Sequence, residues 1–414
     1  MKVVNQEQIE KWDLEDPLAS KRLAFSLPDN IVYLDGNSLG AMPSGAKLRA
    51  KTVLDEQWGN DLITSWNKHH WIDLPLTVGN KIAPLIGAAS GQVVCCDSTS
   101  INLFKVLSSA MALQKSRSVV LSLAGNFPTD LYMVEGLASV LAEDACHLKL
   151  VDESALENAL NVDVAVLMLT QVDFRSGKLL NMQRLTQLAH EHGILVIWDL
   201  AHSAGALPIE LDACEVDFAV GCGYKYLNGG PGAPAFLYVA QRHHNNVTQP
   251  LKGWMGHKHP FAFSAGYEQA NDISQYLCGT PNVISMSILD AALDVFSDVS
   301  MYALREKSVA LSELFITLVE GNSSLSELHL VSPRDAKLRG SQLAFRHEHA
   351  HAICQALIHY GVIADFRAPD ILRFGFTPLY LRYQDMLKST DILAKIIRQK
   401  IYQHPQFNLQ QKVT

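Results

Sequence analysis

Between residues 118 and 240, short apolar runs alternate with segments in which apolar residues recur at helical spacing. A continuous apolar run between polar turns is typical of a strand buried on both faces, as in a parallel sheet. Strands that alternate with helices predict right-handed crossovers and a mainly parallel α/β sheet. The predicted strands are residues 119–123, 148–151, 164–169, 194–198, 216–220 and 235–239, and the predicted helices between them are residues 130–141, 153–160 and 182–192.

The chain before this region has a less regular pattern. Residues 1–30 predict one amphipathic helix and a connector, and Pro28-Asp29 is a typical turn that would end this segment. The other elements predicted before residue 118 are a strand at 31–34, a helix over 45–58, a strand at 93–96 and a helix from Ile101.

Beyond residue 285 the pattern predicts a second, smaller α/β domain. The expected organisation is an N-terminal helix and loop (1–45), a large domain (46–285) and a small C-terminal domain (286–414). The elements predicted in the small domain are a long helix to about Leu318, strands at 328–332, 342–346, 362–366 and 371–375, and helices near 348–360 and 383–403.

Composition narrows the class of protein. A chain of 414 residues is too long for one hydrophobic core, and an apolar content of 48% indicates a globular protein. The net charge of −8 offers no basic surface for nucleic acid or an anionic membrane. The seven cysteines form no CxxC pair, which predicts reduced thiols, and no apolar run approaches the roughly 20 residues that span a bilayer. We therefore expect a cytoplasmic enzyme.

The stretch from Trp198 to Gly232 holds an acid, a histidine and a lysine at the ends of apolar runs. Asp199 falls at the carboxyl end of a predicted strand, where open α/β sheets bind their ligands. Lys225 lies in a glycine-rich turn beyond the next strand. A carboxylate keeps a pyridine nitrogen protonated, and a partly desolvated lysine amine forms a Schiff base with a carbonyl. Together these residues indicate a site for pyridoxal phosphate.

Each of these residues also has a plainer interpretation. Most lysines are solvated surface charges, and only its context distinguishes Lys225. His202 can pack over the cofactor ring, or it can be a histidine that is merely hydrogen-bonded within its turn. The sixteen histidines include no HExxH pattern, and the chain has no GxSxG pattern. We therefore expect neither a metal ion nor a serine triad.

Two helix starts are candidates for cofactor contacts. The segment 97–100 offers free N–H groups and a positive dipole end to an anion, although serine and threonine are also ordinary N-caps. In the segment 126–130, Asn-Phe-Pro-Thr-Asp, Phe127 can face a flat ring, and Asp130 is expected to cap the next helix.

Two more segments have both a ligand-binding and a structural interpretation. The loop 36–40 is rich in backbone donors and is either a ligand contact or an ordinary turn. Three tryptophans that lie close together in sequence can form the wall of a pocket or the edge of the core, and these are Trp58, Trp66 and Trp71.

An amino-acid substrate needs a partner for its α-carboxylate. Arg373 follows a short apolar run in the predicted small domain, and a guanidinium binds a carboxylate at two points. Arg346 and Arg367 are the competing candidates.

Several motifs resemble those of one family over nearly the whole chain, namely kynureninase, a fold-type-I pyridoxal phosphate enzyme. They are YLDGNSLG at 33–40, NFPTD at 126–130, WDLAHSAG at 198–205, GYKYLNGGPG at 223–232, GWMGH at 253–257 and LRFGFTPLY at 372–380. One departure is CCDSTS at 95–100, which is more polar than expected before a phosphate-binding helix.

The resemblance implies a role for each matching residue. Lys225 forms the Schiff base with pyridoxal 5'-phosphate, Asp199 holds the ring nitrogen with Asp130 nearby, and Phe127 stacks on the ring. Tyr224 lies beside the phosphate and is the expected general acid or base. The other implied cofactor-binding residues are Thr99, Ser100, Pro128, Thr129, Thr170 and His202, together with Trp254 and Thr280, which reach in from the partner subunit of a homodimer.

The resemblance also implies the reaction, which is the hydrolytic cleavage of L-kynurenine to anthranilate and L-alanine in tryptophan catabolism. Trp66 and the pair Gly279-Thr280 resemble the bacterial-type pocket, so 3-hydroxykynurenine is expected to be the poorer substrate. Asn37, Ser38 and Arg373 are the other implied substrate-binding residues.

The alternative is another enzyme of the same fold, such as a cysteine desulfurase or another member of the class V aminotransferase family, because GTPN at 279–282 resembles those relatives too. A desulfurase needs a persulfide-forming cysteine on a mobile loop. Cys354 lies within a helical pattern and Cys278 precedes the GTP turn, so neither is well placed.

Overall fold

The computed structural model describes residues 6–142 and 144–409. The chain forms two compact units. We call Ala46–Asp173 with Leu180–Leu293 the sheet unit, and Met1–Gly45 with Phe174–Leu179 and Asp294–Thr414 the terminal unit. Residues 174–179 belong to the terminal unit although the segments before and after them belong to the sheet unit. The hydrophobic pattern of the sequence does not indicate this. The three-part division expected from the sequence, with boundaries at 45 and 285, stays a prediction.

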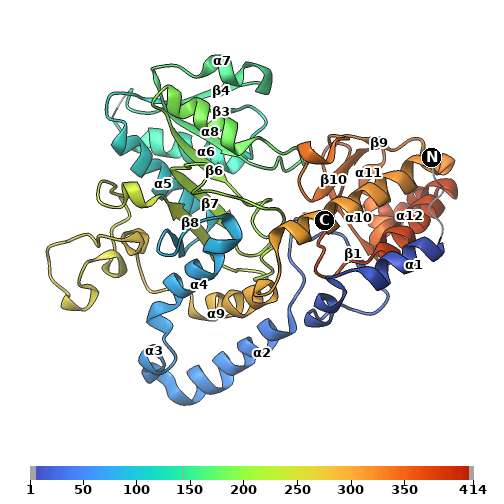
Figure 1. Cartoon of the computed structure of the whole chain (residues 1–414), viewed down its shortest axis with the longest axis horizontal. Helices are drawn as coiled ribbons and strands as arrows, with labels where there is room; N and C mark the ends of the chain where they lie inside the picture. Colours follow the sequence, from blue (N-terminus) through green and yellow to red (C-terminus); the bar gives the residue numbers. More distant parts are fainter. Residues whose placement is uncertain (1–5, 143, 410–414) are drawn as a thin grey trace. The chain divides into compact units, whose positions relative to one another are not determined.

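The sheet unit is built on seven strands in the order β2-β8-β7-β6-β5-β3-β4 (Figure 1). The strands from β4 to β7 pair in parallel, whereas β8 is antiparallel to both of its neighbours. The predicted mainly parallel α/β sheet is therefore confirmed. The strands are β2 (Val93–Cys95), β3 (Val119–Leu123), β4 (His147–Val151), β5 (Val164–Thr170), β6 (Leu195–Asp199), β7 (Phe218–Cys222) and β8 (Ala235–Val239).

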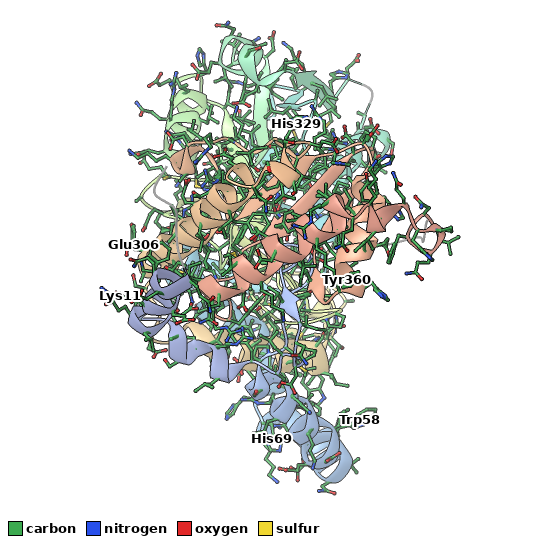
Figure 2. All side chains as sticks on the ribbon, turned by 90° about the vertical axis from the view of Figure 1, so that its right-hand side faces the viewer. Lys11, Trp58, His69, Glu306, His329 and Tyr360 are labelled. Carbon is green, nitrogen blue, oxygen red and sulfur yellow. The ribbon has the colours of Figure 1, made fainter. Side chains whose placement is uncertain are left out.

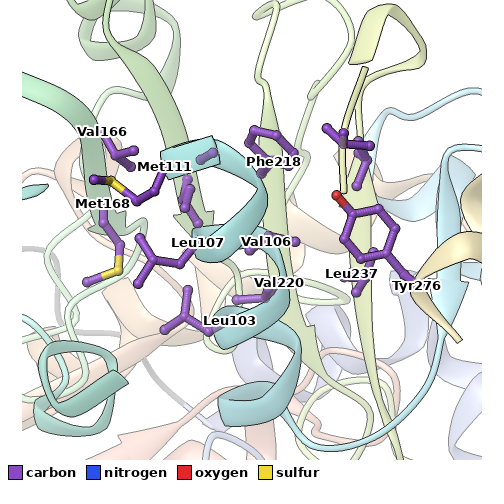
Figure 3. Packing of buried hydrophobic residues seen from close by; sticks show 14 of the residues in the cluster. Leu103, Val106, Leu107, Met111, Val166, Met168, Phe218, Val220, Leu237 and Tyr276 are labelled. Carbon is purple, nitrogen blue, oxygen red and sulfur yellow. The ribbon is translucent and has the colours of Figure 1, made fainter. Parts of the chain in front are cut away.

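Helices cover both faces of this sheet. On one face, Leu103 and Leu107 of α5 (Thr99–Leu113) belong to one buried cluster with Ile197 and Val220. Figure 3 labels Leu103, Leu107 and Val220 in this cluster. On the other face, the indole N–H of Trp198 donates to Thr186 Oγ1 in α8 (Met182–Glu191) at 3.1 Å. Successive residues of β6 thus face different helices, as the alternation of a strand requires. Each fully buried side chain of this kind contributes about 1.5–3 kcal/mol.

The remaining helices of the sheet unit include one change from the expected structure. The predicted helix over 45–58 begins as α2 (Ser44–Thr52) but continues as a π-helical segment, Val53–Asp61. A side chain at Gly59 would crowd the carbonyl oxygen of Leu54, five residues earlier, so glycine permits this wider turn. The other helices here are α3 (Ser65–Lys68), α4 (Leu74–Ile82), α6 (Pro128–Val140), α7 (Leu156–Ala159) and α9 (Val283–Ala292).

The terminal unit contains a four-stranded antiparallel sheet, β12-β13-β10-β9, and a two-stranded parallel sheet, β1-β11. Phe315, Phe345 and Phe374 form its aromatic core. The elements are α1 (Gln6–Glu15), β1 (Val32–Tyr33), α10 (Met301–Glu320), β9 (His329–Leu330), β10 (Gln342–Arg346), α11 (Ala350–His359), β11 (Val362–Ile363), β12 (Asp365–Arg367), β13 (Ile371–Gly375) and α12 (Tyr383–Arg398).

Two predictions about the later part of the chain were wrong in detail. The single long helix expected up to Leu318 is two helices, because Ser300 caps a new helix, α10, by accepting the N–H of Ala303. The strand expected at 362–366 divides into β11 and β12, which pair with different strands. Within the described residues, no helix is long and apolar enough to cross a membrane.

Candidate active site

Asp199 is the last residue of β6, as the apolar pattern predicts, and it is 4% exposed. Thr170, the last residue of β5, lies beside it in the parallel register. Asp199 Oδ1 accepts the N–H of Ala201 at 2.8 Å. The strand order thus places a buried carboxylate at the carboxyl edge of the sheet.

A second buried carboxylate, Asp130, lies close to the first. Asn126 Nδ2 donates to Asp130 Oδ2 at 2.9 Å. Thr170 Oγ1 lies 3.2 Å from Asp130 Oδ2 and 3.5 Å from Asp199 Oδ2. A threonine hydroxyl has one proton, so it can donate to only one of the two carboxylates.

The expectation that Asp130 caps α6 was wrong. The residue at the N-cap is Phe127, which makes no side-chain capping hydrogen bond, and Asp130 occupies the first turn. Its carboxylate is bonded to Asn126 and Thr170 instead, because these donors lie at the strand edge beside it. Asn126 also accepts the backbone N–H of Thr170 at 2.8 Å, so it fixes the two segments together.

Burial disfavours the ionised form of both carboxyl groups. It raises the pKa of Asp130 well above its usual range, and the negative charge of Asp199 raises that pKa further. Burial also raises the pKa of Asp199, while the positive charge of Lys225 opposes this shift. A second cation near Asp199 would therefore favour its ionised form.

Lys225 and His202 meet at the same edge of the sheet. Lys225 lies in the turn after β7, and its Nζ is 3.0 Å from Nε2 of His202, which is 5% exposed. His202 therefore contacts the amine and is not merely hydrogen-bonded within its own turn. Lys225 Nζ is also 5.8 Å from the ring centre of Tyr224, and burial raises the pKa of that phenol.

Local backbone geometry explains the glycine at the start of this turn. A Cβ at Gly223 would clash with the carbonyl oxygen of Pro234 and would lie 2.7 Å from a methyl carbon of Leu289. The turn that carries Lys225 can therefore approach its neighbours only without a side chain at this position.

Thr99 and Ser100 form the first turn of α5. Ser98 is the N-cap, and its hydroxyl accepts the N–H of Ile101 at 3.4 Å. The structural interpretation of this segment thus holds for Ser98. The first backbone N–H groups of a helix have no partner within it, so those of Thr99 and Ser100 can bind an anion.

The other residues expected around the cofactor lie in loops and helix starts. Phe127 is 39% exposed at the N-cap of α6, and Pro128 and Thr129 follow it in the first turn. Trp254 begins a short 3-10 helix and packs edge-on against Phe261, with ring centres 5.7 Å apart. Gly279 and Thr280 are exposed in the loop before α9.

Two of the three clustered tryptophans line a cavity of about 530 Å³. Trp58 and Trp71 line it, together with Pro281 and Asn282 of the segment after Thr280. Trp66 packs edge-on against Trp71 with ring centres 5.9 Å apart. Figure 2 labels Trp58 on the helical segment after α2, where its side chain is 56% exposed. Both a pocket wall and a packed edge are therefore present.

In the terminal unit, Arg373 and Ser38 are brought together with Asp365. Arg373, which is 1% exposed, donates to Ser38 Oγ at 3.2 Å and forms an ion pair with Asp365. Ser38 Oγ donates to Asp365 Oδ2 at 2.9 Å. Arg373 also donates to the carbonyl oxygen of Phe174.

This cluster contains buried polar atoms with no hydrogen-bond partner among the described residues. They are Nε of Arg373, both amide atoms of Asn37, Oδ1 of Asp35 and Oγ1 of Thr377. Buried polar atoms in folded proteins nearly always have a hydrogen-bond partner, so these atoms are candidates for contacts with a polar ligand.

The two competing arginines are much more exposed than Arg373. The side chain of Arg346 is 58% exposed and pairs with Asp370, and that of Arg367 is 38% exposed and pairs with Asp365. Asn126 and Asp365 were missed as site residues by sequence reasoning. Asn126 belongs to the NFPTD motif, which is the signal that could have identified it, whereas Asp365 has no such signal.

Comparisons with known proteins identify both family and fold relatives. The model of the kynureninase C-terminal domain matches residues 304–393. A kynureninase from Pseudomonas fluorescens is 49% identical over 407 residues, covering 97% of this chain and 98% of that protein. A kynureninase from Burkholderia pseudomallei (strain 1106a) is 47% identical over the same shares of each chain.

Solved structures with much lower identity share the fold. A cysteine desulfurase from Thermococcus onnurineus NA1 matches with a TM-score of 0.78 at 16% identity, covering 92% of this chain and 98% of that one. A mutant of the protein C-DES, with glycine covalently linked to its PLP cofactor, matches with a TM-score of 0.77 at 15% identity over 95% of this chain and 99% of that one. The fold is therefore that of these enzymes.

Proposed function

Because this chain belongs to the kynureninase family, we propose that it is a pyridoxal phosphate-dependent hydrolase that cleaves the Cβ–Cγ bond of L-kynurenine to give anthranilate and L-alanine. The observation that carries the proposal is the buried carboxylate of Asp199 at the carboxyl edge of the sheet, near the amine of Lys225 that lies beside His202.

The residues at this edge fit the cofactor. Among the described residues, Asp199 accepts one hydrogen bond of 2.8 Å and one weak contact of 3.5 Å. A protonated ring nitrogen would supply both a donor and the positive charge that a buried carboxylate requires. The N–H groups of Thr99 and Ser100 would hold the phosphate, and Phe127 would cover the ring. Pro128, Thr129 and Thr170 complete the proposed cofactor site.

When bound, pyridoxal phosphate supplies an electron sink for bonds at the substrate α-carbon. Lys225 would hold the cofactor carbonyl at rest and then move the α-proton on its Nζ, with His202 Nε2 as the neighbour that orients the amine. Tyr224 keeps its phenolic proton because burial raises its pKa. It can therefore donate that proton near Cβ and the substrate carbonyl.

The α-carboxylate of the substrate is assigned to Arg373. Among the described residues, its buried Nε–H has no hydrogen-bond partner, and neither has the side-chain amide of Asn37. A carboxylate accepts several hydrogen bonds and would satisfy both groups, with Ser38 beside them. Binding would thus remove the cost of leaving these donors buried and unpaired.

The aromatic end of the substrate is assigned to Trp66, Gly279 and Thr280. The resemblance gives animal-type members a histidine and a Ser-Asn pair at these places, and this chain has neither the histidine nor the asparagine there. A 3-hydroxyl group that is buried without a partner costs about 1–3 kcal/mol, so L-kynurenine is the preferred substrate.

The proposed catalytic unit is a cytoplasmic homodimer. In this arrangement, Trp254 and Thr280 of one subunit reach the phosphate of the other, which agrees with the exposure of Thr280. The proposed role is in tryptophan catabolism.

A direct assay separates this function from a desulfurase. Cys354 is fully buried, and burial raises the pKa of its thiol, so it is unsuited to form a persulfide. We expect purified, cofactor-loaded protein to release fluorescent anthranilate from L-kynurenine and no sulfide from cysteine. Sulfide release without anthranilate would overturn the proposal.

A further inference from the structure

Lys105 of α5 carries a charge inside the sheet unit. Its side chain has no exposed surface. Its Nζ donates to Asp97 Oδ2 at 2.5 Å and to the carbonyl oxygen of Tyr276 at 2.5 Å, and it lies 3.9 Å from Cys96 Sγ. A buried ammonium needs such partners because removing it from water is costly. Cys96 and Asp97 belong to the unusually polar segment before α5.

The contact with Asp97 holds the turn from β2 into α5. Asp97 has a positive φ of 46°, a conformation that non-glycine residues adopt rarely. Its carbonyl accepts the N–H of Ala235 at 2.9 Å, and the N–H of Cys96 donates back to Ala235 at 2.9 Å. The next residue is Ser98, the N-cap. Lys105 therefore holds the start of α5 in place, and with it the direction of the backbone N–H groups in the first turn.

The contact with Tyr276 holds a second segment. Tyr276 is fully buried in the core cluster, where Figure 3 labels it, and its hydroxyl donates to Ser109 Oγ at 2.8 Å. Two residues later, the carbonyl oxygen of Cys278 accepts the N–H of Met255 at 3.2 Å. Thr280 lies two residues beyond Cys278. One ammonium thus joins the helix start to the segment that leads to Thr280.

We propose that Lys105 is a positioning residue for phosphate binding. It holds the first turn of α5, which would bind the phosphate of its own subunit, in one fixed arrangement with the segment 276–280, whose Thr280 would reach the phosphate of the partner subunit. The inference rests on the proposed function. A buried ion pair is often no more stabilising than apolar residues of the same volume, so its contribution here lies in the geometry it imposes. Backbone N–H donors that are already held in position bind an anion without the entropic cost of ordering their segment.

Replacing Lys105 by methionine, which has similar length and no charge, tests this idea. We expect the Kd of the apoprotein for pyridoxal 5'-phosphate to rise about tenfold in Lys105→Met, which corresponds to about 1.4 kcal/mol. The Kd for pyridoxal, which lacks the phosphate, should stay unchanged, because Lys225 and Asp199 are untouched. Both constants can be measured by the yellow absorbance of the bound carbonyl.

The chain offers a matched control in Lys307→Met. Lys307 of the terminal unit is also buried, at 5% exposure, with Asp16 at 2.6 Å and the carbonyl oxygen of Pro378 at 2.5 Å. This variant should lose a comparable buried ion pair without any change in either Kd. A second variant, Asp97→Asn, keeps a residue that tolerates positive φ, and it should raise the Kd for pyridoxal phosphate by a smaller factor.

The outcomes separate the inference from the function on which it rests. Equal Kd values for pyridoxal phosphate in wild type, Lys105→Met and Asp97→Asn would overturn the positioning role. An equal loss of affinity for pyridoxal and its phosphate would overturn it too. If the wild-type chain itself binds neither compound, the proposed function fails instead.

Discussion

Two buried carboxylates in the same sheet unit differ in how many donors surround them. Asp217, just before β7, accepts hydrogen bonds from His190, His243, Arg242 and the backbone of Val196, all between 2.7 and 2.9 Å. Burial alone would raise its pKa, but the hydrogen bonds from His190 and His243 lower it.

Asp199, at the end of β6, is similarly buried but has far fewer donors than Asp217 among the residues that the structure describes, and burial raises its pKa. A carboxylate whose oxygens already accept hydrogen bonds from several protein donors, such as Asp217, stabilises the fold as an anion. We call a buried carboxylate with few protein donors, such as Asp199, an open carboxylate, and it favours a cationic ligand. The number of protein donors thus distinguishes Asp217, which belongs to a stabilising network, from Asp199, which belongs to the candidate active site of the same sheet.

The strongest test of this contrast removes the amine beside the open carboxylate. Lys225→Ala should lower turnover of L-kynurenine about a thousandfold or more, because it removes the proposed attachment and proton-transfer group. Anthranilate fluorescence measures the loss, and circular dichroism should show an unchanged fold. Retained turnover would exclude Lys225 from catalysis.

The open carboxylate itself should matter to activity more than to stability. Asp199→Asn is expected to lower kcat about a hundredfold, because an amide cannot keep the ring nitrogen protonated. The pKa of Asp199 in the folded protein is raised above its ordinary value of 3.8, so ionised Asp199 destabilises the fold at neutral pH. The cofactor-free Asp199→Asn variant should therefore unfold at the same temperature as wild type or at a higher one. A large drop in its unfolding temperature would contradict the comparison.

The saturated carboxylate should behave in the opposite way. Asp217→Asn should lower the free energy of unfolding by about 2–3 kcal/mol, since hydrogen bonds to a charged group are lost. Because the folded-state pKa of Asp217 is lowered, its contribution is present above the ordinary value of 3.8 and is lost as pH falls below it. Urea unfolding at several pH values measures this. Turnover per folded molecule should be unchanged.

A smaller effect is expected at the aromatic end of the substrate. The double variant Trp66→His with Thr280→Asn should shift the ratio of kcat/KM toward 3-hydroxykynurenine about tenfold, because it supplies polar partners for the hydroxyl. Competition between the two substrates measures the ratio. An unchanged ratio would remove both residues from the substrate pocket.

A third carboxylate extends the comparison to the terminal unit. Burial, followed by the charge of Asp365, raises the pKa of Asp35 to about 7, while Ser38, Arg373 and Arg367 lower it. Ionised Asp35 would repel a substrate carboxylate, so KM should rise a few-fold as pH rises through about 7. In Asp35→Asn this dependence should disappear. A pH profile of KM that is identical in both proteins would show that Asp35 does not face the substrate.

The hydrophobic pattern predicted most of the sheet because each strand is a local feature. Residues 119–123 form β3 as expected, and Asp199 ends β6. The pattern could not distinguish Asp199 from Asp217, since both adjoin apolar runs. Their difference depends on donors from distant segments, such as His243 for one and Thr170 for the other. The π-helical turn was missed for a similar reason, because it depends on backbone contacts and not on apolar spacing.

The measurement that tests the account most directly is the unfolding temperature of wild type, Asp199→Asn and Asp217→Asn, each with and without pyridoxal 5'-phosphate. A ligand stabilises the fold that binds it. We predict that the cofactor raises the unfolding temperature of wild type and Asp217→Asn by the same increment and that of Asp199→Asn by a clearly smaller one. An equal increment in all three proteins would contradict the assignment of Asp199 as the carboxylate that holds the cofactor ring.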